Sequence, residues 1–340
     1  MIAAVGARAP VGLYADAVGT AVHAGISRLS FHPRWVDRTG ERMRAAMDAR
    51  LPDSLPVSER MYAMGLSALD EATHGLRARA RAGFYIGLPE PRPGWTLDEG
   101  ERLVERLSAA LLPRVALETV ESVPKGHAAG LLALEAAAAK IEAGHLELAL
   151  VLGVDSYLNA LTMEWLDENR QLANEANRAG FIPGEAAGCC LVGSRERLAQ
   201  LGLPTLARLV GVASRLEPNR IKTDAVCVGR GLSDAIEAAT AALRLPEQKI
   251  RTTYCDINGE SYRSEEFMYV PLRVWAPFVD SNAYVAPADC WGDVGAASGP
   301  LFLTLAAVSA RRGYAAGRHM LAWASSECGA RAAAAVESCE

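Results

Sequence analysis

Short apolar runs alternate along the chain with longer segments in which apolar residues recur at helical spacing. The short runs predict strands at residues 2–7, 83–88, 146–154, 187–192, 206–213, 251–257, 319–325 and 330–336. The longer segments predict helices at residues 59–76, 97–111, 126–142, 233–243, 260–275 and 295–312. This alternation favours an α/β protein in which helices cover the sheets.

Local signals mark the starts of two predicted helices. Thr96 and Glu99 fit a capping box, in which a hydroxyl and a carboxylate each accept from an otherwise unpaired amide. Gly229 and Gly231 superficially match a dinucleotide-binding loop, but Asp234 stands where a third glycine belongs. We therefore interpret this pair of glycines as a helix cap.

Two stretches resemble copies of one unit. Residues 126–154 and 295–324 each begin with small residues, continue as an apolar helix and end in a buried strand. Small side chains allow two helices to approach closely, so we expect these helices to pack together at the centre of the fold. The duplication predicts two halves, residues 1–203 and 204–340, with the boundary near Leu203 and Pro204.

The composition excludes several classes of protein. The 340 residues are 50% hydrophobic and 22% charged, and this large apolar share excludes general disorder. The net charge is −5. No long basic run indicates a nucleic-acid surface or a membrane anchor. The apolar runs are shorter than the roughly 20 residues of a membrane span. Residues 1–12 lack the pattern of a secretory signal, so we expect a cytoplasmic protein without membrane or nucleic-acid partners.

The seven cysteines predict neither a disulfide framework nor a metal site. Their number is odd and their spacing shows no Cys-x-x-Cys pair. We expect reduced thiols in the core at Cys189, Cys190, Cys255 and Cys290. We predict no zinc and no other cofactor.

A resemblance to a known family rests on two segments. The run Gly-Phe-Ile-Pro-Gly-Glu-Ala-Ala-Gly at residues 180–188 resembles the Gly-Phe-x-x-Gly-Glu-Gly-Ala-Gly loop and strand of β-ketoacyl synthases. Residues 128–156 resemble the helix and strand that follow the nucleophile in that family. The resemblance implies the thiolase fold, with five layers, α-β-α-β-α, built from two pseudo-symmetric halves.

The same resemblance implies three site positions. The family uses a cysteine thiolate at a helix N-terminus and two histidines that promote decarboxylation and stabilise the enolate. Counting along the segments places the nucleophile at Ser122, the first histidine at Asn258 and the second histidine at Asp293. Of the glycine-rich loop that helps to form the oxyanion hole, only Gly329 remains, within residues 325–330.

These replacements predict that condensation is lost. A serine hydroxyl needs a general base, but Asn258 cannot accept a proton, and the carboxylate of Asp293 would repel an enolate. Structural roles are the alternative: Ser122 caps the helix that begins near Gly126, and His127 packs or caps at the same start. The polar segment 258–267 is predicted to be a solvated helix start, or else a recognition surface.

Three functions follow as hypotheses. The first is a non-enzymatic accessory protein, a role that degenerate relatives fill in bacterial secretion systems, notably type VI loci. The second is an acyltransferase or thioesterase that uses Ser122 with acyl-coenzyme A or an acyl carrier protein. The third is a partner subunit of an active synthase, like the chain length factors. For assembly, the resemblance implies a homodimer in which the strand at residues 114–120 pairs across a two-fold axis.

Overall fold

The computed structural model describes residues 1–76 and 79–339 and contains one large mixed sheet. The strands join in the order β10-β9-β11-β12-β8-β1-β7-β6-β4-β5. Those of the first half are β1 (Ile2–Arg8), β4 (Ala80–Leu88), β5 (Val115–Pro124), β6 (Leu148–Ser156) and β7 (Glu185–Gly193). Those of the second half are β8 (Ala207–Leu216), β9 (Thr252–Cys255), β10 (Tyr284–Val285), β11 (His319–Ser325) and β12 (Ala330–Ser338). A single residue pair, Ile2 with Ala207, links β1 to β8 and so joins the two halves.

The two groups of strands have the same topology. In the first, β5, β4 and β6 run parallel and β7 and β1 follow antiparallel. In the second, β10, β9 and β11 run parallel and β12 and β8 follow antiparallel. The duplication expected from the sequence is therefore present in the fold. The boundary at residue 203 lies between α6 (Arg195–Gln200) and β8 and stays a prediction.

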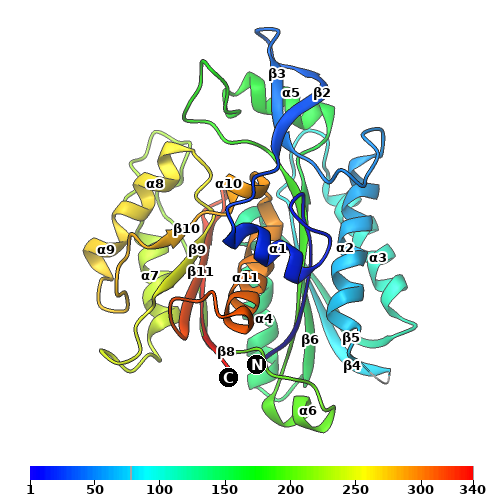
Figure 1. The fold of residues 1–340 in the computed structure, drawn as a ribbon, viewed down its shortest axis with the longest axis vertical. Helices are drawn as coiled ribbons and strands as arrows, with labels where there is room; N and C mark the ends of the chain where they lie inside the picture. The colour runs from blue at the N-terminus through cyan, green and yellow to red at the C-terminus, as the bar shows by residue number, and fades with distance from the viewer. Residues whose placement is uncertain (77–78, 340) are drawn as a thin grey trace.

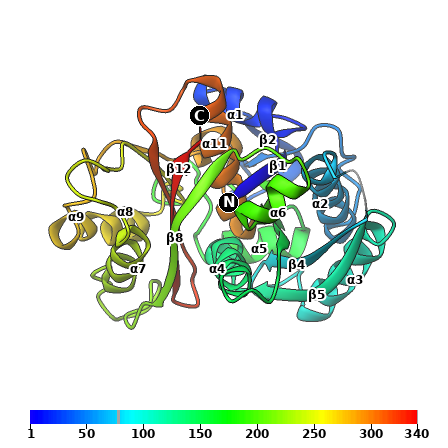
Figure 2. The same ribbon diagram turned by 90° about the horizontal axis from the view of Figure 1, so that it is seen from below.

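Helices form three layers around and between the two groups of strands (Figures 1 and 2). The helices α2 (Val57–Thr73) and α3 (Leu97–Leu111) cover the outer face of the first group. The helix α7 (Arg230–Thr240) covers the outer face of the second group. Between the groups lie α4 (Ala129–Glu142) and α11 (Ser298–Arg312), each preceded by a 3-10 turn, η1 (Gly126–Ala128) or η2 (Gly295–Ala297).

Glycine allows the close approach of the two central helices. A Cβ atom placed on Gly130 would lie 2.2 Å from Cδ of Pro300, and one on Gly299 would lie 2.8 Å from Cγ of Leu131. Real Cβ atoms do not come so close to their neighbours, so neither position accepts a larger residue without movement. The expected close packing is confirmed, and it brings the N-termini of α4 and α11 together.

The predicted helix starts are also confirmed, whereas one predicted helix is wrong. Thr96 and Glu99 form the capping box of α3, and Gly229 is the N-cap of α7 with a φ of +64°. The helix predicted at residues 260–275 is divided into α8 (Ser261–Met268) and α9 (Val270–Arg273). The break falls next to Pro271, which has no amide hydrogen to donate and is tolerated only in the first turn of a new helix.

Several elements lack a clear periodic signal in the sequence. They are α1 (Ala15–His23), β2 (Leu29–Val36), β3 (Arg42–Ala46), α5 (Ala160–Glu168), β10 and α10 (Ala288–Trp291). The pair β2 and β3 forms a separate two-stranded sheet, which projects at the top of Figure 1. Because most of β2 is exposed, few of its positions need apolar residues.

Buried thiols and the helix lengths agree with the expectations from composition. Cys189, Cys190, Cys255 and Cys290 are buried, and each is a free thiol. Burial raises the pKa of Cys190 to about 12. Within residues 1–76 and 79–339, no helix has both the length and the apolar character to cross a bilayer.

Candidate functional site

The starts of the two central helices meet at a buried ion pair. His127, in η1, places Nε2 2.9 Å from both carboxylate oxygens of Asp293, which lies two residues before η2. Asn258, which follows β9, donates from Nδ2 to Asp293 Oδ2 at 2.5 Å. The amide of Gly295 donates to Asp293 Oδ1 at 2.8 Å. Of the three predicted positions, the structure thus brings together Asn258 and Asp293, and it adds His127.

Ser122 does not lie at the helix start, where the sequence placed it. It is an exposed residue of β5, paired in register with Ile86 of β4. The strand continues to Pro124, and the helical turn begins only at Gly126. Counting by sequence missed this because Pro124 and Lys125 extend the strand and the connection. The residue at the helix N-terminus beside Asn258 and Asp293 is His127.

The predicted capping role of Ser122 is also wrong. The turn η1 has Lys125 as its N-cap, with no side-chain capping bond. Instead, the amide of Ala128 donates to Oγ of Ser326 at 2.8 Å. Ser326 belongs to the connection between β11 and β12. Its hydroxyl oxygen therefore accepts a hydrogen bond from an amide at the helix N-terminus.

A cavity of about 190 Å³ opens beside the ion pair. Its lining includes five acidic side chains, two basic ones and three aromatic rings: Glu90, Asp155, Glu260, Asp293 and Glu327, then Arg92 and His127, then Tyr157, Trp165 and Phe181. Pro91, Gly126, Leu166 and Gln171 complete the described lining. None of these described residues offers a thiol or an aliphatic hydroxyl.

Comparisons with known proteins agree with this geometry. The family described as β-ketoacyl synthase, N-terminal domain, matches residues 120–197, which include the end of β5, the helix α4 and the strands β6 and β7. The oxazolomycin ketosynthase domain of Streptomyces albus JA3453 is 15% identical, with a TM-score of 0.76 over 100% of this chain and 74% of that one. The chain therefore has the thiolase fold, and its residues 120–197 are similar to the N-terminal domain of β-ketoacyl synthases.

Two further solved structures similar to this chain contain a second kind of subunit by their descriptions. The ishigamide ketosynthase/chain length factor is 16% identical, with a TM-score of 0.73 over 100% of this chain and 99% of that one. A ketosynthase in complex with its chain length factor, from Xenorhabdus doucetiae, is 16% identical, with a TM-score of 0.74 over 99% and 97%. No curated protein sequence matches the chain.

Arg263 is a buried cation that lies next to the ion pair of His127 and Asp293. It is 1% exposed and donates to Asp256 Oδ2 at 2.7 Å and to the carbonyl of Ser325 at 2.9 Å. Its Nε donates to Glu260 Oε2 at 3.2 Å, and its Nη2 lies 3.2 Å from Nε2 of His127. The polar segment 258–267, expected to be solvated, thus places Glu260 and Arg263 in the interior, because each charge there has a partner.

The charges around His127 shift its pKa in both directions. Burial and the neighbouring guanidinium of Arg263 lower the pKa of His127, whereas the charge and hydrogen bond of Asp293 and the charge of Asp256 raise it, and the pKa lies above its ordinary value. Burial raises the pKa of Asp293, whereas His127, Arg263 and the bond from Asn258 hold it well below its usual range. The stable state is therefore an imidazolium paired with a carboxylate.

Two more cations complete the charge pattern of the cavity. Arg92 donates to Asp155 Oδ1 at 2.5 Å, and its guanidinium lies over the ring of Tyr157 at 4.2 Å. Lys222 lies 3.2 Å from Glu260 Oε1 and also pairs with Glu327. The sequence analysis missed Arg92, Lys222 and Arg263. Arg92 and Lys222 come from segments far from the family motifs, so only the fold brings them to the site. Arg263 lies within the polar segment 258–267, but nothing in the sequence indicated that this side chain is buried.

Proposed function

We propose that this chain is a non-condensing subunit that pairs with a ketosynthase, in the manner of a chain length factor. The observation that carries the proposal is the residue at the helix N-terminus. Where the family's chemistry needs a thiolate, this chain has His127 in a buried pair with Asp293. Protonation occupies the one in-plane lone pair with which an imidazole attacks, so His127 cannot take an acyl group as an imidazolium.

The surroundings of the pair support the same proposal. A condensing site needs amide hydrogens free to stabilise an oxyanion, but the amide of Ala128 is bound to Ser326. The carboxylate of Asp293 would oppose the negative charge of an enolate. The cavity also contains more acidic than basic side chains, which disfavours the burial of an apolar acyl chain.

The position of Ser122 weakens the acyltransferase and thioesterase alternative. Its exposed hydroxyl lies on an edge strand and not in the cavity lining. An exposed serine without a base has the weak nucleophilicity of an ordinary alcohol. The alternative therefore lacks the activation that it requires.

The edge strand β5 supplies a surface for pairing. It is the last strand of the sheet, next to β4, and Glu118, Val120 and Ser122 alternate on its exposed side. An edge strand with free backbone groups can continue its sheet into a partner. We propose that β5, including residues 114–120, pairs with a ketosynthase chain. A homodimer through the same strand and an accessory role in a secretion system stay predictions that the same experiments address.

Two measurements test the proposal. Intact-mass spectrometry follows wild type and Ser122→Ala after incubation with acyl-coenzyme A and acyl carrier thioesters, and we expect no Ser122-dependent gain in mass. Co-expression with a ketosynthase chain of the same organism is expected to give a heterodimer. A Ser122-dependent adduct would refute the loss of acyl chemistry, and an exclusive homodimer would refute the partner.

A matched pair of variants tests the pairing surface. Val120→Lys places a charge on β5, where the side chain is 40% exposed, and it should abolish the heterodimer in sedimentation. Leu161→Lys places the same charge on α5, where the side chain is 59% exposed, and it should leave the assembly intact. Equal behaviour of the two variants would exclude β5 as the interface.

A further inference from the structure

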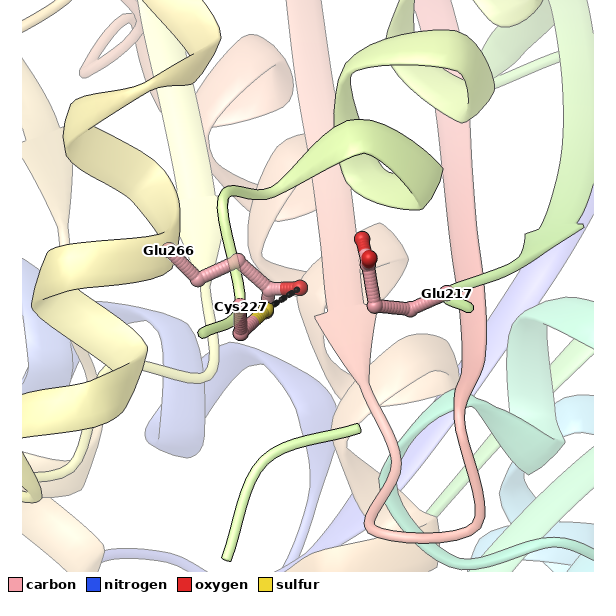
Figure 3. A group of neighbouring side chains, drawn as sticks. All are labelled: Glu217, Cys227 and Glu266. Carbon is pink, nitrogen blue, oxygen red and sulfur yellow. Dashed lines mark hydrogen bonds between the residues drawn. The ribbon is translucent and has the colours of Figure 1, made fainter. Parts of the chain in front are cut away.

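Three side chains that could ligate a metal converge away from the cavity. Glu217 directly follows β8, Cys227 lies in the segment before α7, and Glu266 belongs to α8 (Figure 3). One potential ligand atom from each lies within 4.8 Å of the other two. Both carboxylates are 1% exposed, and the thiol is partly exposed. We call these three residues the Glu-Cys-Glu cluster.

The cluster contains buried polar atoms without partners. Glu266 Oε2 and Arg331 Nη2 are buried and have no hydrogen-bond partner among the described residues. Arg331 Nε donates to the other oxygen of Glu266 at 2.5 Å. Leaving a buried carboxylate oxygen unpaired costs roughly 1–3 kcal/mol, more for a charged group, so such an atom calls for a ligand.

The charges of the cluster do not balance either. Among the described residues, Glu266 pairs with the guanidinium of Arg331 and no ion pair is recorded for Glu217, which leaves an excess of one negative charge. Glu217 is further stabilised by the amide of Gly231, at 2.7 Å, at the start of α7. Burying net charge is expensive unless a counter-ion or a metal compensates it.

We propose that the Glu-Cys-Glu cluster binds one divalent transition-metal ion of the zinc class. Zinc takes thiolate and carboxylate ligands at about 2.3 and 2.1 Å, so a sulfur and an oxygen across a tetrahedral ion lie about 3.6 Å apart. In the structure, Sγ of Cys227 donates to Oε1 of Glu266 at 3.6 Å, so replacing the thiol proton by the ion requires little change in the separation of the two atoms. On binding, the thiol loses its proton to solvent, and the dication with the new thiolate cancels the excess negative charge. The pair with Arg331 then orients the Glu266 ligand.

Metal binding here would anchor the segment that carries Lys222. Residues 217–227 begin and end at two of the proposed ligands and contain Lys222, which pairs with Glu260 and Glu327, two residues that line the cavity. Fixing both ends of this segment limits the freedom of Lys222. No metal site was predicted from the sequence because the usual signal is a pair of closely spaced cysteines. This ligand set has one cysteine and two distant glutamates. The proposal does not depend on the proposed function.

Metal content and cobalt spectroscopy test the site. Tag-free protein is dialysed against Zn²⁺ or Co²⁺, and wild type should retain one ion per chain, with a thiolate-to-cobalt band in the near ultraviolet. Cys227→Ser should remove the band and weaken Co²⁺ binding more than about 100-fold, because even an outer-shell change costs 10–100-fold. Cys328→Ser, at another partly exposed thiol, should change neither.

A second variant and a proteolysis measurement distinguish loss of the metal from loss of the fold. Glu266→Gln should also lower the metal content, with circular dichroism confirming that the fold is retained. Adding a chelator to the wild type should accelerate proteolysis within residues 217–229. The proposal would be overturned if wild type retained no stoichiometric ion. It would also be overturned if Cys227→Ser and Glu266→Gln bound Co²⁺ as wild type does.

Discussion

Replacing Asp293 by asparagine tests the buried ion pair directly. The side chain keeps its size, but the charge that faces His127 is lost. Asp293 is 4% exposed and accepts bonds from His127, Asn258 and Gly295. Asparagine offers one acceptor oxygen in place of two, and its amide group confronts one of these donors. His127 is then left close to Arg263 without a counter-ion.

The expected loss of stability follows from the burial of the pair. Removing one partner of a buried ion pair typically costs about 3–5 kcal/mol. His127 can release its proton in the variant, which limits the loss, so we expect about 3 kcal/mol. At about 2.1 cal/mol/K per residue, the unfolding entropy of 340 residues is about 0.7 kcal/mol/K, and the melting temperature falls by only about 4 °C. Urea unfolding is therefore the more sensitive measurement.

The assay compares urea midpoints, followed by circular dichroism, for wild type, Asp293→Asn and a control. The control is Glu59→Gln, which removes one partner of an exposed pair with Arg106, whose side chains are 41% and 42% exposed. Such pairs contribute less than about 1 kcal/mol. If Asp293→Asn unfolded within about 0.5 kcal/mol of wild type with an unchanged slope, the ion pair would not stabilise the fold, and the account of the site given above would be wrong.

Three further predictions concern pH, packing and thiol reactivity. The folded-state pKa of His127 is raised, so its stabilising contribution is complete below its unfolded pKa of about 6.5 and is lost as pH rises through the folded-state pKa. Urea midpoints measured from pH 6 to 9 should therefore fall more steeply for wild type than for His127→Gln. Gly130→Ala, which forces a contact with Pro300, should lower the free energy of unfolding by about 1–3 kcal/mol. Gly75→Ala, whose added Cβ meets Leu203 at an ordinary 3.5 Å, should be tolerated, and urea unfolding curves compare the two variants. Cys190 is fully buried with a pKa near 12 and should resist a thiol reagent in the native protein, as peptide mass spectrometry will show; rapid labelling would contradict its place in the core.

Much of the fold could be predicted from the sequence because its signals are local. Apolar runs, the capping box at Thr96 and the small residues at Gly130 and Gly299 each act through neighbours in the chain or through a helix face that repeats every turn. The duplication was visible because both halves reuse the same order of small residues, helix and strand. The weakest signals were those of β2 and β3, where exposure removes the need for an apolar pattern.

The site was only half predictable, because its geometry depends on contacts between distant segments. The family resemblance, and no local pattern, singled out Asn258 and Asp293 from the sequence, and the structure places their side chains in contact. Which residue meets them depended on where β5 stops and η1 begins, and pairing with β4 decides that through hydrogen bonds that no local pattern records. Only the tertiary structure placed His127 beside Asp293 in a buried ion pair and brought in Arg263 from α8 to face it, because these contacts join segments that lie far apart in the sequence.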